Sequence, residues 1–180
     1  MFRSTARRLL GSAVLLIVLL IGFLLFRPDK LFVDDPVGES LADAFPVATS
    51  TSVPTATITT VTASTASVPA GPLTIAAGSF AGISHTASGN VMVYEQGGVN
   101  VLRFEDDTNI QNGPDLYVWV LPSAGYDGGT PGSYLDLGKL KGNVGGQNYE
   151  LPPEFDPSVH RAILIWCLRF AVPFAVAPLA

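Results

Sequence analysis

An apolar block at residues 9–26 sets the strongest limit on how this chain folds, because it contains no charged residue. As a helix rising about 1.5 Å per residue it would be roughly 27 Å long, close to the ~30 Å hydrocarbon core of a bilayer. A cleaved signal peptide has a shorter apolar region of about 7–15 residues, closely followed by small residues at the cleavage site. The nearest such pattern, Ala42-Asp43-Ala44, lies well beyond Arg27 and Lys30. The sequence therefore predicts an uncleaved signal-anchor over residues 1–30, with a transmembrane helix at 9–26.

The charges around this block predict its orientation. Arg3, Arg7 and Arg8 precede it without any acidic residue, and Arg27 and Lys30 follow it. Positive charge favours the cytoplasmic side of a membrane. We expect a single-pass membrane protein with a cytoplasmic N-terminus and an extracytoplasmic C-terminal domain. No cysteine directly follows the block, which excludes lipid attachment of the lipoprotein type.

Residues 31–71 are predicted to form a disordered extracytoplasmic linker. Within them, about half of residues 47–69 are Ser or Thr, and none is charged. Such a tract has too little apolar surface for a core of its own. Extended at roughly 3 Å per residue, it could hold the next domain on the order of several tens of ångströms from the membrane. A tether without a selected length would have the same composition.

Residues 72–180 are of domain size and are predicted to be all-β. Residues 91–95 and 99–104 are predicted to be two short strands on either side of a Gly-rich turn at Gln96-Gly97-Gly98. Residues 116–121 are apolar on both faces, as in a central strand. Weaker strands are expected at residues 74–77, 134–140 and 147–151. This spacing of strands and turns favours a β-sandwich of about seven to nine short antiparallel strands.

The charge of this domain excludes one class of partner. Residues 72–180 hold five basic and ten acidic side chains. An acidic surface repels the phosphate backbone, so we expect no nucleic acid partner. The motifs of common hydrolases are also absent from the sequence, although enzymatic activity as such is left open.

The only cysteine, Cys167, lies in an apolar run near the C-terminus. If residues 163–177 stayed extended, Leu164 and Trp166 would lie on the core face, and Cys167 would share the other face with Arg169. A cation about 7 Å away would favour the thiolate. The alternative is that Cys167 is a small buried hydrophobe, the usual state of a free cysteine.

The sequence contains few residues that could bind a metal ion. Two histidines, His85 and His160, with Cys167 and Met92 would complete a blue-copper set. That set usually has a His and a Met shortly after the cysteine, and residues 168–180 contain neither. The cysteine count excludes cysteine-rich zinc and iron–sulfur sites. Copper or non-covalent haem stays open as a cofactor, with His85 and Cys167 as candidate ligands.

Five blocks of the domain, in order along the chain, form a distinctive pattern. They are Gly78-Ser79-Phe80 with His85 and Gly89; Gly113-Pro114-Asp115-Leu116-Tyr117-Val118; Leu137-Gly138-Lys139-Leu140-Lys141-Gly142; Gly146-Gln147-Asn148-Tyr149 with Leu151-Pro152; and Ile165-Trp166-Cys167 with Phe170, Val172, Phe174, Ala177 and Leu179. Over residues 73–179 this pattern resembles the DM-thirteen domain, a family named for electron transfer. Ala175 departs from it, since a glycine is common there.

The resemblance implies a β-sandwich related to the haem- or sugar-binding DOMON domains, carried by exported proteins and acting in redox reactions through its cysteine. It implies that Cys167 is the redox residue, and it marks His85 and Asp115 as motif positions without an assigned role. Two hypotheses follow. One is a membrane-tethered redox or electron-transfer module with a redox partner protein. The other is a non-enzymatic binding module for a cell-envelope ligand, in which Cys167 is structural.

Overall fold

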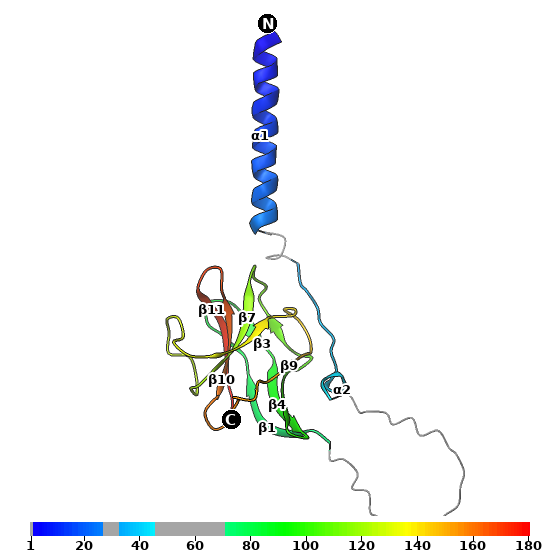
Figure 1. Cartoon of the computed structure of the whole chain (residues 1–180), viewed down its shortest axis with the longest axis vertical. Coiled ribbons are helices and arrows are strands. Elements are labelled where there is room, and N and C mark those ends of the chain that lie inside the picture. The colour runs from blue at the N-terminus through cyan, green and yellow to red at the C-terminus, as the bar shows by residue number, and fades with distance from the viewer. Residues whose placement is uncertain (1, 27–32, 46–70) are drawn as a thin grey trace, which may run out of the picture.

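The computed structural model describes residues 2–26, 33–45 and 71–180 (Figure 1). Helix α1 spans Phe2–Phe26, and in its part with described side chains, residues 11–24, almost every side chain is exposed. Within the described residues, no helix is both long and apolar enough to cross a membrane. The transmembrane helix predicted over residues 9–26 is therefore not supported by the structure.

The first sheet has four antiparallel strands in the order β1-β4-β5-β9. They are β1 (Leu73–Ser79), β4 (Asn90–Gln96), β5 (Val99–Phe104) and β9 (Gln147–Glu150). The predicted hairpin is confirmed, with Gln96 opposite Val99 at its tip. Gly97 and Gly98 have φ of 62° and 85°, as a two-residue turn with matching twist requires.

The second sheet has five antiparallel strands in the order β2-β11-β10-β7-β8. They are β2 (Ala81–Gly82), β11 (Val172–Pro178), β10 (Ala162–Cys167), β7 (Leu116–Leu121) and β8 (Leu135–Lys139). The predicted central strand is confirmed as β7, which lies between β10 and β8. Two short strands, β3 (Ala87–Ser88) and β6 (Asn109–Ile110), pair separately.

The two larger sheets share one apolar core. Val93 and Leu102 from the first sheet and Val118 and Ile165 from the second belong to the same buried cluster, and all four are 0% exposed. Two antiparallel sheets that enclose a common core form a β-sandwich. The predicted all-β class is therefore confirmed.

The C-terminal run is not one strand. Strand β10 ends at Cys167, a turn occupies residues 168–171, and β11 returns antiparallel beside β10. Ala171 in this turn has φ of 52°, an uncommon value for a residue with a Cβ. A bulge between Ile165 and Trp166 shifts the pairing of the two strands. The extended conformation expected over residues 163–177 is therefore wrong, and Arg169 belongs to the turn.

Residues 33–45, here called the docked segment, lie against the domain (Figure 1). Val37 N donates to Val144 O at 2.8 Å, and Glu39 N donates to Gly146 O at 2.9 Å. Helix α2 (Leu41–Ala44) ends the segment beside β9. The predicted disordered linker over residues 31–71 thus includes an ordered part, and residues 31–32 and 46–70 lie outside the described residues.

The Ser/Thr-rich tract at residues 47–69 lies outside the described residues. The chain contacts the domain before this tract, at residues 33–45, and again after it, at β1. These contacts do not test the prediction that the tract is a spacer from a membrane, so it stays a prediction.

Candidate functional site

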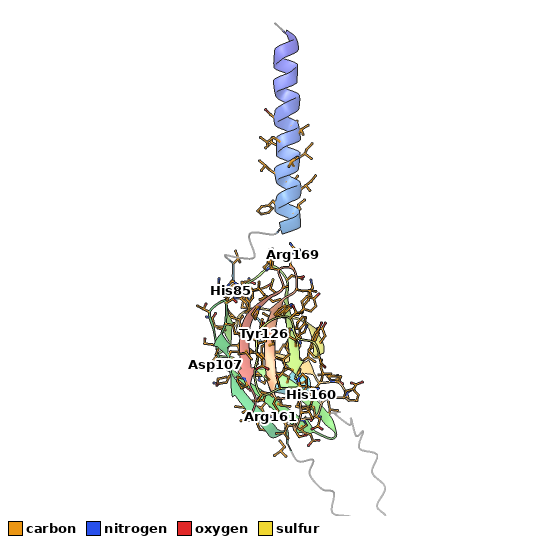
Figure 2. The ribbon with its side chains drawn as sticks, turned by 90° about the vertical axis from the view of Figure 1, so that its left-hand side faces the viewer. His85, Asp107, Tyr126, His160, Arg161 and Arg169 are labelled. Atoms are coloured by element: carbon orange, nitrogen blue, oxygen red, sulfur yellow. The ribbon has the colours of Figure 1, made fainter. Side chains whose placement is uncertain are left out.

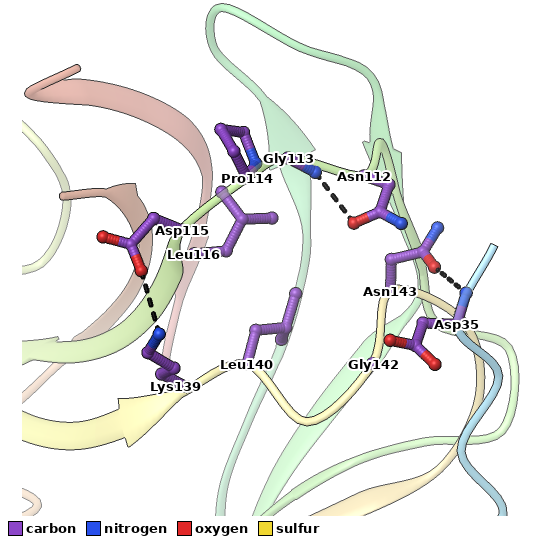
Figure 3. A pocket seen from close by; sticks show the side chains of 10 residues that line it. All are labelled: Asp35, Asn112, Gly113, Pro114, Asp115, Leu116, Lys139, Leu140, Gly142 and Asn143. Carbon is purple, nitrogen blue, oxygen red and sulfur yellow. Dashed lines mark hydrogen bonds and ion pairs between the residues drawn. The ribbon is translucent and has the colours of Figure 1, made fainter. Parts of the chain in front are cut away.

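A polar pocket of about 260 Å³ lies where the segment before β7 faces the segment after β8 (Figure 3). Residues 112–116 form one wall and residues 139–143 the other, and Asp35 of the docked segment completes the lining. Two of the five sequence blocks, those around Gly113 and Lys139, therefore meet here. Half of the lining residues carry a carboxylate, amide or ammonium group, and Leu116 and Leu140 are among the apolar ones.

The turn before β7 is held by its own side chains. Asn112 Oδ1 accepts a hydrogen bond from Gly113 N at 2.8 Å, and Asn112 Nδ2 donates to Val33 O at 2.7 Å. Gly113 has no room for a side chain, because a Cβ would meet the Phe174 ring. Pro114 follows, and its ring fixes its φ shortly before β7 begins. The Asn112-Gly113-Pro114 turn thus places Asp115 in the lining of the pocket.

Asp115 forms an ion pair with Lys139 across the pocket mouth, with 3.1 Å between Oδ1 and Nζ (Figure 3). The hydrogen bond from Lys139 to Asp115 and the charge of that carboxylate raise the pKa of the Lys139 ammonium. The Lys139 side chain is 68% exposed, so solvent screens much of this attraction. The main-chain oxygen of Asp115 accepts from Leu168 N at 3.0 Å, which ties the pocket to the turn after Cys167.

Cys167 lies directly behind this pocket. In the register of β7 and β10 it is the partner of Leu116, which lines the pocket. Its thiol is free and 0% exposed, and it belongs to the main core between the two sheets. The sulfur is therefore close to the pocket wall but closed to solvent.

The strand faces are the reverse of those predicted. Cys167 shares the inner face of β10 with Ile163 and Ile165, whereas Leu164 and Trp166 belong to a second cluster on the outer face. The alternation itself is as expected, but the face assigned to each set is wrong. The expected cation beside the thiol is also absent from this strand face, because β10 ends at Cys167.

His85 lies at the same end of the sandwich as the pocket. Its ring stacks on Phe174 with 3.7 Å between centroids, and Phe174 in turn lies against Gly113. His160 lies toward the opposite end of the domain (Figure 2), where its Nδ1 accepts from Asp156 N at 3.0 Å. The two histidines of the candidate copper set therefore lie apart.

These residues do not fit the cofactors left open by the sequence. Among the described residues, no group of three or more His, Cys, Asp or Glu side chains could hold a metal ion. The pocket in front of Cys167 is smaller and more polar than a haem group needs, since ligand cavities of that kind are larger and mostly apolar. His85 and Cys167 thus have neither the third ligand nor the apolar cavity that copper or haem would require.

Sequence reasoning missed the charged contacts of the docked segment. The Glu39 carboxylate accepts from Lys141 Nζ at 2.8 Å and from Asn148 N at 2.7 Å, and its main-chain oxygen accepts from Arg103 at 2.8 Å. Although burial acts against it, the bonds from Lys141 and Asn148 lower the pKa of Glu39. The signal in the sequence was the glycine-rich stretch at residues 142–146, since such glycines permit close approach of another backbone.

Tyr149 bonds to Gln147 and Lys141, beside the contacts of Glu39, from within the core. It is 5% exposed, donates to Gln147 Oε1 at 2.6 Å and accepts from Lys141 N at 3.1 Å. Burial is the main reason that the pKa of its hydroxyl is raised, and the nearby Glu39 charge adds to it. The block at residues 146–149 thus anchors both the core and the docked segment.

The fold and site define an all-β sandwich whose single thiol is buried next to Leu116, in the wall of a pocket that two of the five sequence blocks form. A family model described as electron transfer DM13 matches residues 79–179, more than half of the 180-residue chain. The chain therefore belongs to the electron-transfer DM13 family. No curated protein and no solved structure matches it.

Proposed function

We propose that this chain is a membrane-tethered extracytoplasmic domain that takes part in electron transfer through Cys167. The family match supports a role in electron transfer in general. The observation that carries the cysteine's part is its position, since Cys167 is the strand partner of Leu116, which lines the pocket where the blocks around Gly113 and Lys139 meet. Cys167 is also the one thiol in the chain.

Burial determines which redox chemistry is open to this sulfur. Thiol–disulfide exchange needs direct attack by a thiolate on a sulfur atom, and no second sulfur can reach a side chain that is 0% exposed. An electron, unlike a thiol reagent, can cross packed protein. The role proposed for Cys167 is therefore one-electron exchange with a carrier protein that binds outside the core. The thiol gives one electron to the oxidised carrier and one proton to water, which leaves a thiyl radical, and one electron from a reduced carrier with one proton restores the thiol.

The experiment compares the full-length chain with Cys167→Ala, which removes the sulfur and adds no polar atom to the core. In a mediated electrochemical titration without oxygen, the wild type should exchange one more electron per molecule than Cys167→Ala does. If the two proteins behave alike, the redox role of Cys167 is refuted.

The alternative is a binding module in which Cys167 is structural, with a cell-envelope ligand as its partner. The complete burial of Cys167 in an apolar cluster favours this alternative, because a free cysteine in such a place packs as a small hydrophobe. In that case Cys167→Ala should bind the ligand as the wild type does, whereas Lys139→Ala at the pocket mouth should bind it less tightly.

The membrane attachment is part of the proposal and rests on α1. Its described side chains include Leu15, Leu16, Ile17 and Phe23, each at least half exposed. Apolar side chains exposed in such number call for an apolar partner, and a bilayer would provide one. The full-length chain should sediment with membranes, and a chain lacking residues 1–30 should not.

Protease added outside the cell should cleave the domain. Protection of the domain would refute the extracytoplasmic location.

A further inference from the structure

A second cluster covers the outer face of the five-stranded sheet, away from the main core. It contains Trp119 and Trp166, with Tyr117 and Tyr126 packed against it. The Trp119 ring stacks on Tyr134 with 3.8 Å between centroids and 14° between planes. It also stacks on Trp166 with 5.2 Å between centroids and 20° between planes. Three aromatic rings thus form one continuous stack.

The stack runs from the surface to the interior. Tyr134 is 38% exposed, whereas Trp119 and Trp166 are each 2% exposed. Trp166 is adjacent to Cys167 in β10, and the two side chains point to opposite faces of that strand. The inner end of the stack is therefore one residue from the buried sulfur, and the outer end is open to solvent.

Trp119 has an unusual polar group for a buried ring. Its Nε1 is buried and has no hydrogen-bond partner within the described part of the chain. Buried polar groups normally have such a partner, so this one is an exception that needs a reason. An indole that has lost an electron becomes neutral only by giving up this proton. Without an acceptor, the oxidised ring keeps the proton and instead takes an electron from its neighbour.

Tyr134 differs from Trp119 in this respect. Because its ring is exposed, its phenol can release a proton to water when it loses an electron. A neutral phenoxyl radical is then left at the surface. The difference in proton access along the stack directs the oxidised site from the two buried indoles toward Tyr134.

We propose that Tyr134, Trp119 and Trp166 form a one-electron relay between the surface and the ring beside Cys167, an inference that rests on the proposed electron-transfer function. The oxidised carrier of the proposed function, which acts across packed protein on Cys167, also removes one electron from Trp166, the ring beside that sulfur. Trp119 passes one electron to Trp166, and Tyr134 passes one to Trp119 and a proton to water. The reduced form of a one-electron carrier protein then returns one electron to Tyr134, which regains a proton from water.

The same stack could be no more than packing, because aromatic rings fill the outer face of a sheet well. The test must therefore measure radical transfer rather than stability. Phenylalanine variants serve this purpose, since Tyr134→Phe and Trp119→Phe keep an aromatic ring in place. The chain has only two tryptophans, so every tryptophan radical signal comes from this stack.

The experiment is pulse radiolysis of the full-length chain with azide radical as the one-electron oxidant. In the wild type, the absorption of the tryptophan radical should decay while that of the tyrosine radical grows, at a rate independent of protein concentration. In Tyr134→Phe the tyrosine radical should not form. In Trp119→Phe the radical on Trp166 should persist. Matched urea midpoints confirm that each variant is folded.

Two tyrosines are the controls. Tyr94 lies on the other sheet, where its hydroxyl bonds to Met92 and Glu105, and Tyr126 meets Trp166 only at its edge, with 6.5 Å between centroids. Tyr94→Phe and Tyr126→Phe should both leave the transfer unchanged. If either variant abolishes the tyrosine radical, or if Tyr134→Phe does not, the relay is refuted.

A last variant separates the relay from the proposed function. Cys167→Ala leaves all three rings in place and should transfer the radical as the wild type does. Loss of transfer in Cys167→Ala would refute the relay as drawn. If radical transfer fails in the wild type while Cys167 still exchanges electrons in the titration, the relay is refuted and the proposed function of Cys167 is not.

Discussion

Gly142→Ala should weaken the protein by displacing the docked segment. A Cβ at this position would meet the main-chain oxygen and carbon of Asp35 and the Cγ2 of Val37, all in the docked segment. The backbone at Gly142 does not have a positive φ, so alanine is not strained there by itself. The whole effect should therefore come from the contact with residues 33–45.

The size of the effect follows from two hydrogen bonds beside Gly142. Asp35 N donates to Asn143 Oδ1 at 2.6 Å, and Asn143 N donates to Asp35 O at 3.1 Å. Each such bond contributes about 0.5–1.5 kcal/mol net, so the loss of both should cost about 1–3 kcal/mol. For a domain of this size, each kcal/mol corresponds to a Tm change of about 3–5 °C. Gly142→Ala should lower Tm by roughly 3–15 °C.

A double-mutant cycle tests the reasoning. Urea unfolding is measured for the wild type, for Gly142→Ala, and for both in a chain lacking residues 1–45. In the shortened chain, alanine has nothing to displace and should change the free energy of unfolding by less than about 0.5 kcal/mol. An equal loss of stability in both backgrounds would refute the contact with the docked segment as the cause.

Further predictions concern the buried thiol and the acidic anchor of the docked segment. Cys167→Ser should lower the free energy of unfolding in urea by about 1–3 kcal/mol, since it puts a hydroxyl into a fully buried apolar site. Cys167→Ala is the control, and equal urea midpoints for the serine and alanine variants would contradict the burial. In native buffer, Cys167 should react with a thiol reagent only as fast as the protein unfolds, and rapid labelling would contradict the closed core. Because the folded state lowers the pKa of Glu39, its contribution is present above the ordinary glutamate pKa and is lost as pH falls through the lowered value. Glu39→Gln should therefore make the free energy of unfolding depend less on pH in the acid range. An unchanged pH dependence would exclude this linkage.

Part of the fold could be predicted because it depends on local pattern. The strand-like runs on both sides of Gly97-Gly98 were enough to predict the β4–β5 hairpin, since two adjacent glycines favour a tight turn. The positive φ of both glycines agrees with this. The apolar run at residues 116–121 was likewise enough to predict a central strand.

The site was less predictable because it depends on segments far apart in the sequence. Asp35 and Asn143 are more than a hundred residues apart, and neither belongs to a recognisable motif. The ordered contacts of Glu39 depend on two side chains, Arg103 and Lys141, and on the main-chain N of Asn148, which no local pattern links. The glycine at position 142 signals a close approach but does not say which backbone approaches.

Sequence by itself determined which side chains of β10 alternate together, because the period of a strand is two residues. It also determined that the chain has one thiol and no partner for an internal disulfide. Only the tertiary structure decided that Cys167 faces the main core and Trp166 the outer cluster. The physical reason is that both faces of this five-stranded sheet are covered, one by the four-stranded sheet and the other by aromatic side chains, so an apolar face alone does not identify the core.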